Sequence, residues 1–119
     1  MASEKIAPGL KGQRETVVCE HHLARHVERY STPAMIGLME GASVAACHHL
    51  LEPNQTTVGY IVNVRHRAPA PVGARVVAYA ELTKVEGNKL TFKVEAYHGE
   101  TRIGEGTHQR AVILSTGSG

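Results

Sequence analysis

The chain has 119 residues, which is enough for one domain and too few for two well-packed ones. Its 13 Lys and Arg and 11 Asp and Glu residues give a net charge of +2, without the basic run or aromatic-interleaved basic stripe of a nucleic-acid-binding protein. Residues 1–13 contain no apolar segment of signal-peptide type, and no apolar run approaches the length of a membrane span. We therefore expect a cytoplasmic protein that binds neither nucleic acid nor membrane.

The scarcity of large aromatic residues bears on how this chain forms a core. Trp is absent and Phe92 is the only Phe, so the core must come from aliphatic side chains. Because so short a chain buries only about two-thirds of its unfolded surface, we expect a homodimer or a higher homo-oligomer. Cys19 and Cys47 form no CxxC pair and are expected to be reduced thiols. We expect one domain over residues 1–119, with flexible ends at about 1–12 and 115–119.

The first half of the chain predicts a strand, a polar loop and one long helix. The strand is predicted at Glu15–Glu20, and a His- and Arg-rich surface loop at His21–Tyr30. Thr32 suits the N-cap of the helix that follows, and Pro33 suits its first turn. Over Ala34–Leu51 apolar residues recur at i, i+3 and i+4, and the opposite side is hardly polar either. A helix that is apolar nearly all round is one that other elements enclose.

The second half of the chain predicts strands throughout. They are expected at Thr56–Arg67, Arg75–Val85, Lys89–His98 and Thr101–Leu114, separated by a proline-rich break and two tight turns. One helix cannot cover both faces of a five-stranded sheet, so the simplest arrangement is an α+β fold with an antiparallel sheet curled around the helix. The hot-dog fold has this shape, and on element order alone ferredoxin-like and cystatin-like folds remain alternatives.

Glu40 is the only charged residue between Arg29 and Glu52, and it lies in the middle of the apolar helix. A buried carboxylate must be paired, hydrogen-bonded or protonated. Desolvation raises the pKa of a glutamate toward the range that suits a general base. Two interpretations therefore stand for Glu40: a catalytic group, or a glutamate at one solvated spot of the helix or paired with an arginine.

Three further positions have both a structural and a chemical interpretation. His66 continues the even-numbered face of its strand, which alternation directs inward, and a histidine there is either a packed residue or a catalytic one. Thr32 is fully explained as a helix cap. Gly59 interrupts a β-branched strand, which indicates a bulge or a close backbone approach, and its N–H is a candidate to stabilise an oxyanion.

The remaining histidines do not form a metal-binding motif. They cluster as His21, His22, His26, His48 and His49, but no HExxH or zinc-finger spacing is present, so we predict neither a metal nor a cofactor. The GxSxG, P-loop and GxGxxG motifs are absent as well. His108 and Arg110 share one face of the last predicted strand, and the sequence does not determine whether that face is the inner one.

Several stretches together resemble the fluoroacetyl-CoA thioesterase family of hot-dog proteins. They are Thr32–Glu40, Leu51–Pro53, Val58–His66, Pro71–Gly73, Ala80–Gly87 and Ile103–Ile113, within a likeness that covers about Glu15 to Leu114. The resemblance implies active sites at a dimer interface and an acyl-CoA substrate. It implies catalytic roles for Thr32, Glu40 and His66, and substrate-binding roles for Gly59, through its backbone N–H, and for Arg110.

One departure from the family concerns substrate selectivity. The fluoroacetate-specific enzyme has phenylalanines in the segment before the catalytic threonine, whereas Leu23–Tyr30 contains none. We therefore do not predict discrimination of fluorine. The leading hypothesis is hydrolysis of a small or medium acyl-CoA to a carboxylate and free CoA, with Glu40 as general base or nucleophile. The alternatives are a non-catalytic acyl-CoA-binding module and a hot-dog enoyl-CoA hydratase or dehydratase.

Overall fold

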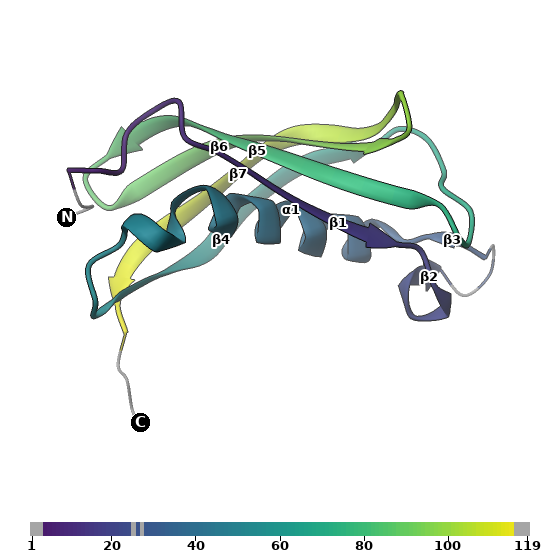
Figure 1. Ribbon diagram of the computed structural model, residues 1–119, viewed down its shortest axis with the longest axis horizontal. Helices are drawn as coiled ribbons and strands as arrows, with labels where there is room; N and C mark the ends of the chain where they lie inside the picture. The colour runs from purple at the N-terminus through teal and green to yellow at the C-terminus, as the bar shows by residue number, and fades with distance from the viewer. Residues whose placement is uncertain (1–3, 25, 27, 116–119) are drawn as a thin grey trace.

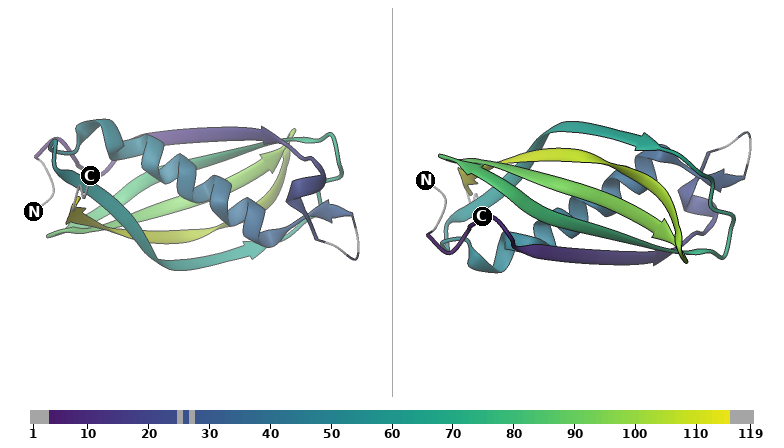
Figure 2. Two further views of the ribbon diagram at one scale, coloured as in Figure 1. Left: turned by 90° about the horizontal axis from the view of Figure 1, so that it is seen from below. Right: turned by 90° about the horizontal axis from the view of Figure 1, so that it is seen from above.

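A computed structural model of the chain describes residues 4–24, 26 and 28–115. Five strands form one antiparallel sheet in the order β1-β5-β6-β7-β4. They are β1 (Lys11–Val17), β4 (Gln55–His66), β5 (Arg75–Glu86), β6 (Lys89–His98) and β7 (Thr101–Leu114). Helix α1 (Thr32–Cys47) runs beneath the curved sheet, as the α+β prediction required (Figure 1). Strands β1 and β4 form the two edges of the sheet on either side of the helix (Figure 2).

Strand β1 begins at Lys11 rather than at the predicted Glu15. The reason is Gly12, where the strand lies against the backbone of α1 so closely that a Cβ would overlap Ala42 and Ala46. The preceding residues also pack on the sheet, since Ile6 is 4% exposed and the Gly9 N–H donates to the Leu82 carbonyl over 2.8 Å.

Helix α1 is capped one residue earlier than predicted. Ser31, not Thr32, is the N-cap, and its hydroxyl accepts a hydrogen bond from the Ala34 N–H at 3.2 Å. Thr32 is the first helical residue, so its hydroxyl is free for another partner. The helix ends at Cys47 and continues as a 3-10 turn, η2 (His48–Leu50), in place of the predicted helical run to Leu51.

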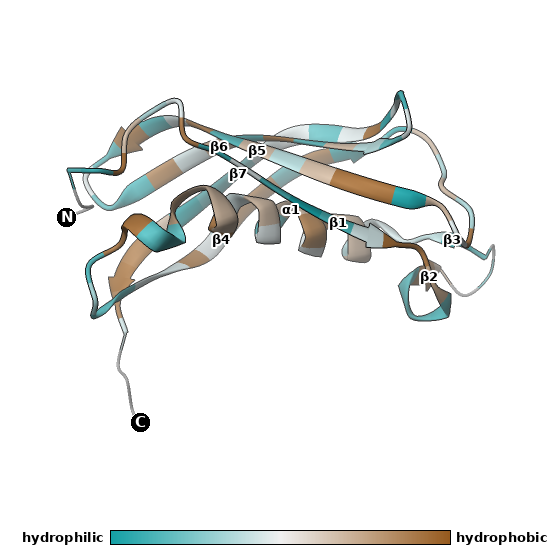
Figure 3. Ribbon diagram, in the orientation of Figure 1, coloured by the Kyte–Doolittle hydropathy of each residue, from teal (hydrophilic) through white to brown (hydrophobic). Residues whose placement is uncertain are grey.

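The core lies between α1 and the inner face of the sheet. The helix is apolar along most of its length (Figure 3). It buries Met35, Met39, Ala42, Ser43, Ala46 and Cys47 against strand residues that include Val76, Ala78, Leu82, Leu90, Phe92, Val94 and Ile103. Among the described residues no helix is both long enough and apolar enough to cross a membrane.

The segment predicted as a polar loop contains short ordered elements. They are the 3-10 turn η1 (Glu20–His22), β2 (Leu23–Ala24) and β3 (Arg29–Tyr30), and the two strands pair in antiparallel fashion. Tyr30 is buried, and the Arg29 backbone forms a bridge to Pro71. This small hairpin lies over the start of α1.

Strand β4 contains a bulge that changes which side chains face the helix. The pairing with β7 shifts between Gly59 and Ile61, so one extra residue is inserted. Val62 then lies opposite the buried His108, and His66 lies opposite Gly104. The prediction that Val58 shares the face of Val62 and His66 is therefore wrong, because the bulge reverses the alternation between them.

Candidate active site

Thr32 and His66 lie in direct contact at one end of the helix. The Thr32 hydroxyl is 2.9 Å from His66 Nδ1. Thr32 reaches the histidine because Ser31 has taken over the capping role, and His66 faces the helix because it follows the bulge in β4. His66 Nε2 is buried and has no hydrogen-bond partner among the described residues.

Glu40 lies in a second cluster, further along the helix. Its Oε2 is 3.8 Å from Arg110 Nη1 and 3.9 Å from His108 Nε2. A Cβ added at Gly59 would lie only 2.8 Å from Glu40 Oε2 and 2.8 Å from His108 Cε1. Gly59 is therefore the residue whose missing side chain leaves room for the carboxylate. The Glu40 side chain is 40% exposed, so a single chain does not bury it as the sequence led us to expect.

His108 and Arg110 face inward and form a hydrogen-bonded network behind Glu40. His108 Nδ1 donates to the Ile61 carbonyl at 2.9 Å, which leaves Nε2 as the acceptor for Arg110 Nη1 at 3.1 Å. Arg110 also donates from Nε to the Thr57 hydroxyl at 2.9 Å and from Nη2 to the Thr57 carbonyl at 3.0 Å. The guanidinium is thus fixed on three sides, with Nη1 directed toward the carboxylate.

Burial lowers the pKa of both histidines. For His66 desolvation is the main cause, and the backbone of Ala68 partly offsets it. For His108 desolvation again dominates, the Ile61 carbonyl acts in the opposite direction, and the nearby Arg110 cation lowers the pKa further. Both rings are therefore favoured in the neutral form, which His108 needs in order to accept from Arg110. Desolvation also lowers the pKa of Arg110, an effect that the Glu40 carboxylate partly reverses.

The two clusters do not meet within one chain. Gly59 lies in the Glu40 cluster and His66 in the other. Along strand β4 these two residues are roughly 20 Å apart, given the rise per residue of a β-strand. The structure thus places Thr32 with His66, and Glu40 with Gly59 and Arg110, but it does not bring all five predicted residues together.

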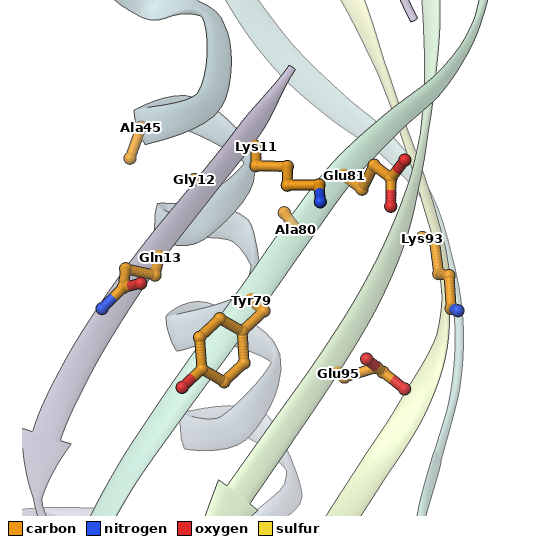
Figure 4. Close-up of a pocket in the computed structure, with 9 residues that line it drawn as sticks. All are labelled: Lys11, Gly12, Gln13, Ala45, Tyr79, Ala80, Glu81, Lys93 and Glu95. Carbon is orange, nitrogen blue, oxygen red and sulfur yellow. The ribbon is translucent and has the colours of Figure 1, made fainter. Parts of the chain in front are cut away.

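The structure has two hollows of similar volume. One, of about 650 Å³, has Thr32 and His66 in its wall. The other, of about 620 Å³, lies over β1, β5 and β6 and is lined by a mixture of charges that includes Lys11, Glu81, Lys93 and Glu95 (Figure 4). It contains none of the predicted site residues. In the part of the chain that the structure describes, no group of three or more His, Cys, Asp or Glu side chains is arranged to hold a metal ion.

Sequence reasoning missed the network role of His108 and did not consider Thr57. The alternation of His108 and Arg110 on one face was visible, but their inward direction depends on the register between β7 and β4. Thr57 has no distinguishing signal in the sequence, because its role is to bind the guanidinium of a residue on the neighbouring strand.

Comparison with known proteins now defines the family. The family model described as fluoroacetyl-CoA-specific thioesterase, FlK, matches residues 12–116. The chain belongs to the fluoroacetyl-CoA-specific thioesterase family. It is 40% identical over 116 residues to the fluoroacetyl-CoA thioesterase of Streptantibioticus cattleyicolor, an alignment that covers 86% of this chain and 84% of that protein.

Solved structures of this family share the fold. A threonine-to-serine variant of FlK in complex with acetyl-CoA superposes with a TM-score of 0.87 at 37% identity, covering 92% of this chain and 90% of that one. A phenylalanine-to-alanine variant of FlK with fluoroacetate and CoA gives 0.86 at 38% identity, over 92% and 96%. A hypothetical protein of Thermus thermophilus from the thioesterase superfamily gives 0.87 at 31% identity, over 92% and 85%. The chain therefore has the hot-dog fold that the sequence predicted.

Proposed function

We propose that this protein hydrolyses acyl-CoA thioesters to a carboxylate and free CoA, at sites that two copies of the chain share. The observation that carries the proposal is that the candidate residues form two separate clusters. Thr32 and His66 lie toward one end of the edge strand β4, and Glu40 lies toward the other. Membership of a thioesterase family, with relatives solved in complex with acetyl-CoA and with CoA, supports the acyl-CoA substrate.

The open edge of β4 supports a two-fold dimer. Within the described chain β4 pairs with β7 on one side only, and four of its apolar side chains are more than 40% exposed: Val58, Tyr60, Ile61 and Val62. A long apolar edge strand of this kind is a surface for pairing with another strand. Antiparallel pairing of two β4 strands about an axis between Val62 and Asn63 sets His66 opposite the partner subunit's Gly59. Thr32 and His66 then meet the partner subunit's Glu40, and each dimer has two complete sites.

The chemistry follows from the groups that such a site contains. Water, activated by Glu40 as general base, adds to the thioester carbonyl, and the carbon–sulfur bond then breaks. Alternatively Glu40 attacks the carbonyl itself and water hydrolyses the resulting anhydride. The leaving thiolate needs no strong acid, because the pKa of its conjugate thiol is about 8.5. Either route requires a free Glu40 carboxylate oxygen, and Oε2 lies 3.8 Å from Arg110 Nη1.

The other residues position these groups. The neutral His66 orients the water or the carbonyl, and Thr32 fixes the ring through Nδ1. Gly59 supplies the backbone N–H for the oxyanion and the space for the carboxylate. Arg110 lies beside the thioester through Nη1, while Thr57 and His108 hold its other nitrogens in place.

The test is release of free thiol from a panel of acyl-CoAs by the wild type and by Glu40→Gln. We expect the variant to lose at least about a hundredfold in rate, as is typical when a catalytic acid or base is removed. Glu81→Gln is the matched control, because Glu81 lies in the other hollow, away from both clusters. Equal rates for Glu40→Gln and the wild type would contradict the proposal.

The same preparation separates the alternatives. Saturable binding of acyl-CoA without thiol release from any substrate indicates a binding module. Hydration of crotonyl-CoA without release of thiol indicates a hydratase.

A further inference from the structure

The hollow beside Thr32 and His66 has two arginines in its wall. Its volume is about 650 Å³, and it lies between the β2–β3 hairpin, the start of α1 and the segment that follows β4. The charged and titratable residues in its lining are His26, Arg29, Tyr30, His66 and Arg67, and the hydroxyls of Ser31 and Thr32 lie among them. Of the described residues that line it, none is a carboxylate.

Arg29 is the arginine in this wall that forms no ion pair with a described residue. Arg67 forms an ion pair with Glu105, which occupies its charge. The Arg29 side chain, by contrast, has no ion pair or hydrogen bond with any residue that the structure describes. Its backbone is nevertheless fixed, because it pairs with Ala24 in the hairpin and with Pro71, and it precedes the buried Tyr30. A guanidinium on a fixed backbone, without a partner among the described residues, can bind a carboxylate or a phosphate.

The position of the hollow indicates which anion it receives. Thr32 and His66 form part of its wall, so whatever fills it lies next to the thioester carbonyl. The phosphates of CoA are separated from the sulfur by the whole pantetheine arm, whereas a carboxylate at the end of a short acyl chain is only a few bonds from the carbonyl. A volume of about 650 Å³ accommodates such an acyl group.

We propose that this hollow selects acyl-CoA substrates whose acyl group ends in a carboxylate, and that Arg29 binds that carboxylate. The inference rests on the proposed thioesterase function and adds the substrate class. Arg29 is then a specificity-determining residue, and the acyl product is a short dicarboxylate. The reaction that supplies the substrate is one that joins a dicarboxylic acid to CoA through one of its two carboxyl groups.

The experiment compares succinyl-CoA with butyryl-CoA, which differ only in a terminal carboxylate against a methyl group, after subtraction of the rates without enzyme. We expect the wild type to have a kcat/KM for succinyl-CoA roughly tenfold or more above that for butyryl-CoA, as a charge-assisted hydrogen bond allows. Arg29→Gln abolishes this preference and changes the butyryl-CoA value less than about twofold. Arg29→Lys restores part of it. Arg75→Gln removes an exposed arginine outside the hollow and leaves the preference intact.

A second pair of substrates distinguishes the two sources of anion. Succinyl and butyryl thioesters of pantetheine lack every CoA phosphate. If the Arg29→Gln effect persists with them, Arg29 binds the acyl carboxylate. If the effect disappears, Arg29 binds a phosphate and the inference is overturned.

The failure of this inference differs from the failure of the proposed function. Rapid release of thiol from butyryl-CoA without a preference for succinyl-CoA overturns the inference and leaves the thioesterase in place. If no thioester is hydrolysed, binding of thioether analogues of CoA by calorimetry still decides the question. Tighter binding of the carboxyalkyl analogue than of the alkyl one, lost in Arg29→Gln, supports the carboxylate site, whereas equal binding refutes it.

Discussion

Gly59 has the most constrained surroundings of the candidate residues. The space that its missing side chain leaves is bounded by Glu40 Oε2, His108 Cε1 and Arg110 Nη1. Of these, only the carboxylate is the end of a flexible side chain, since His108 is held by Ile61 and Arg110 by Thr57. A group added at Gly59 therefore displaces the carboxylate first. Position 59 thus controls where the carboxylate lies.

We expect Gly59→Ala to lower thioester hydrolysis by about tenfold or more, because displacing a reacting group by about 1 Å is enough to cost that much. Overpacking against His108 should also cost about 1–3 kcal/mol in the free energy of unfolding. Thiol release and urea denaturation measure the two effects. Gly37→Ala is the matched control, since a Cβ there meets nothing within 4 Å and lies in the helix, where alanine is favoured. A Gly59→Ala enzyme with the wild-type rate would show that the carboxylate position is irrelevant.

His66 and His108 make stability depend on pH. Burial lowers the pKa of His66 and of His108 below the ordinary value of 6.5, so the unfolded chain takes up protons before the folded chain does. Their contribution to stability is complete above about pH 6.5 and is lost as the pH falls from there through the folded-state pKa values. The hydrogen bond from Arg67 lowers the pKa of Glu105 below its ordinary value of 4.5, so Glu105 titrates outside this pH range.

We therefore expect the free energy of unfolding to fall between pH 7 and pH 5, by at most about 1.4 kcal/mol per pH unit for each histidine. Urea denaturation at a series of pH values measures the slope. His66→Gln keeps a side-chain hydrogen bond to Thr32 within reach, removes one titrating group, and should flatten the curve. A curve of the same slope in the variant would assign the pH dependence to other groups.

At the scale of elements, the sequence predicted the helix and a strand overlapping each of the five strands of the main sheet. The errors lie where a tertiary contact decides the outcome. Ser31 and Thr32 are equally suited to the N-cap, and the contact of Thr32 with His66, distant in sequence, leaves the cap to Ser31. The start of β1 at Lys11 depends on Gly12 meeting the helix backbone, which no local pattern reveals.

The bulge in β4 was indicated by the sequence, but its effect on side-chain direction was not. A glycine within a β-branched strand indicated a bulge or a close approach, and Gly59 combines the two. The consequence for side-chain direction was not predictable, because simple alternation carries Val58 onto the wrong face. His66 was placed correctly since it and Val62 both follow the bulge. His108 was left undetermined for the same reason, as its direction depends on the shifted register.

At the scale of the whole molecule, the two clusters require an explanation that a single chain does not supply. Glu40 is 40% exposed, and the apolar side chains of the β4 edge are open to solvent. In the proposed dimer, pairing two β4 edges would bury those side chains and enclose the carboxylate, so one interface would meet both needs. The proposed symmetry would also make each site depend on two chains, which is a property that mixing experiments can measure.

Mixing Glu40→Gln with His66→Ala should therefore restore activity that neither variant has alone. In the mixed dimer one site combines both substitutions, while the other joins an intact Glu40 from one chain to an intact His66 from its partner. Random pairing of equal amounts gives about a quarter of the wild-type rate of thiol release per chain. Mixing Glu40→Gln with the double variant Glu40→Gln/His66→Ala is the control, because no intact Glu40 remains and no recovery is expected. If native mass spectrometry detects the mixed dimer and activity does not return, Glu40 and His66 act within one chain and the shared site is wrong.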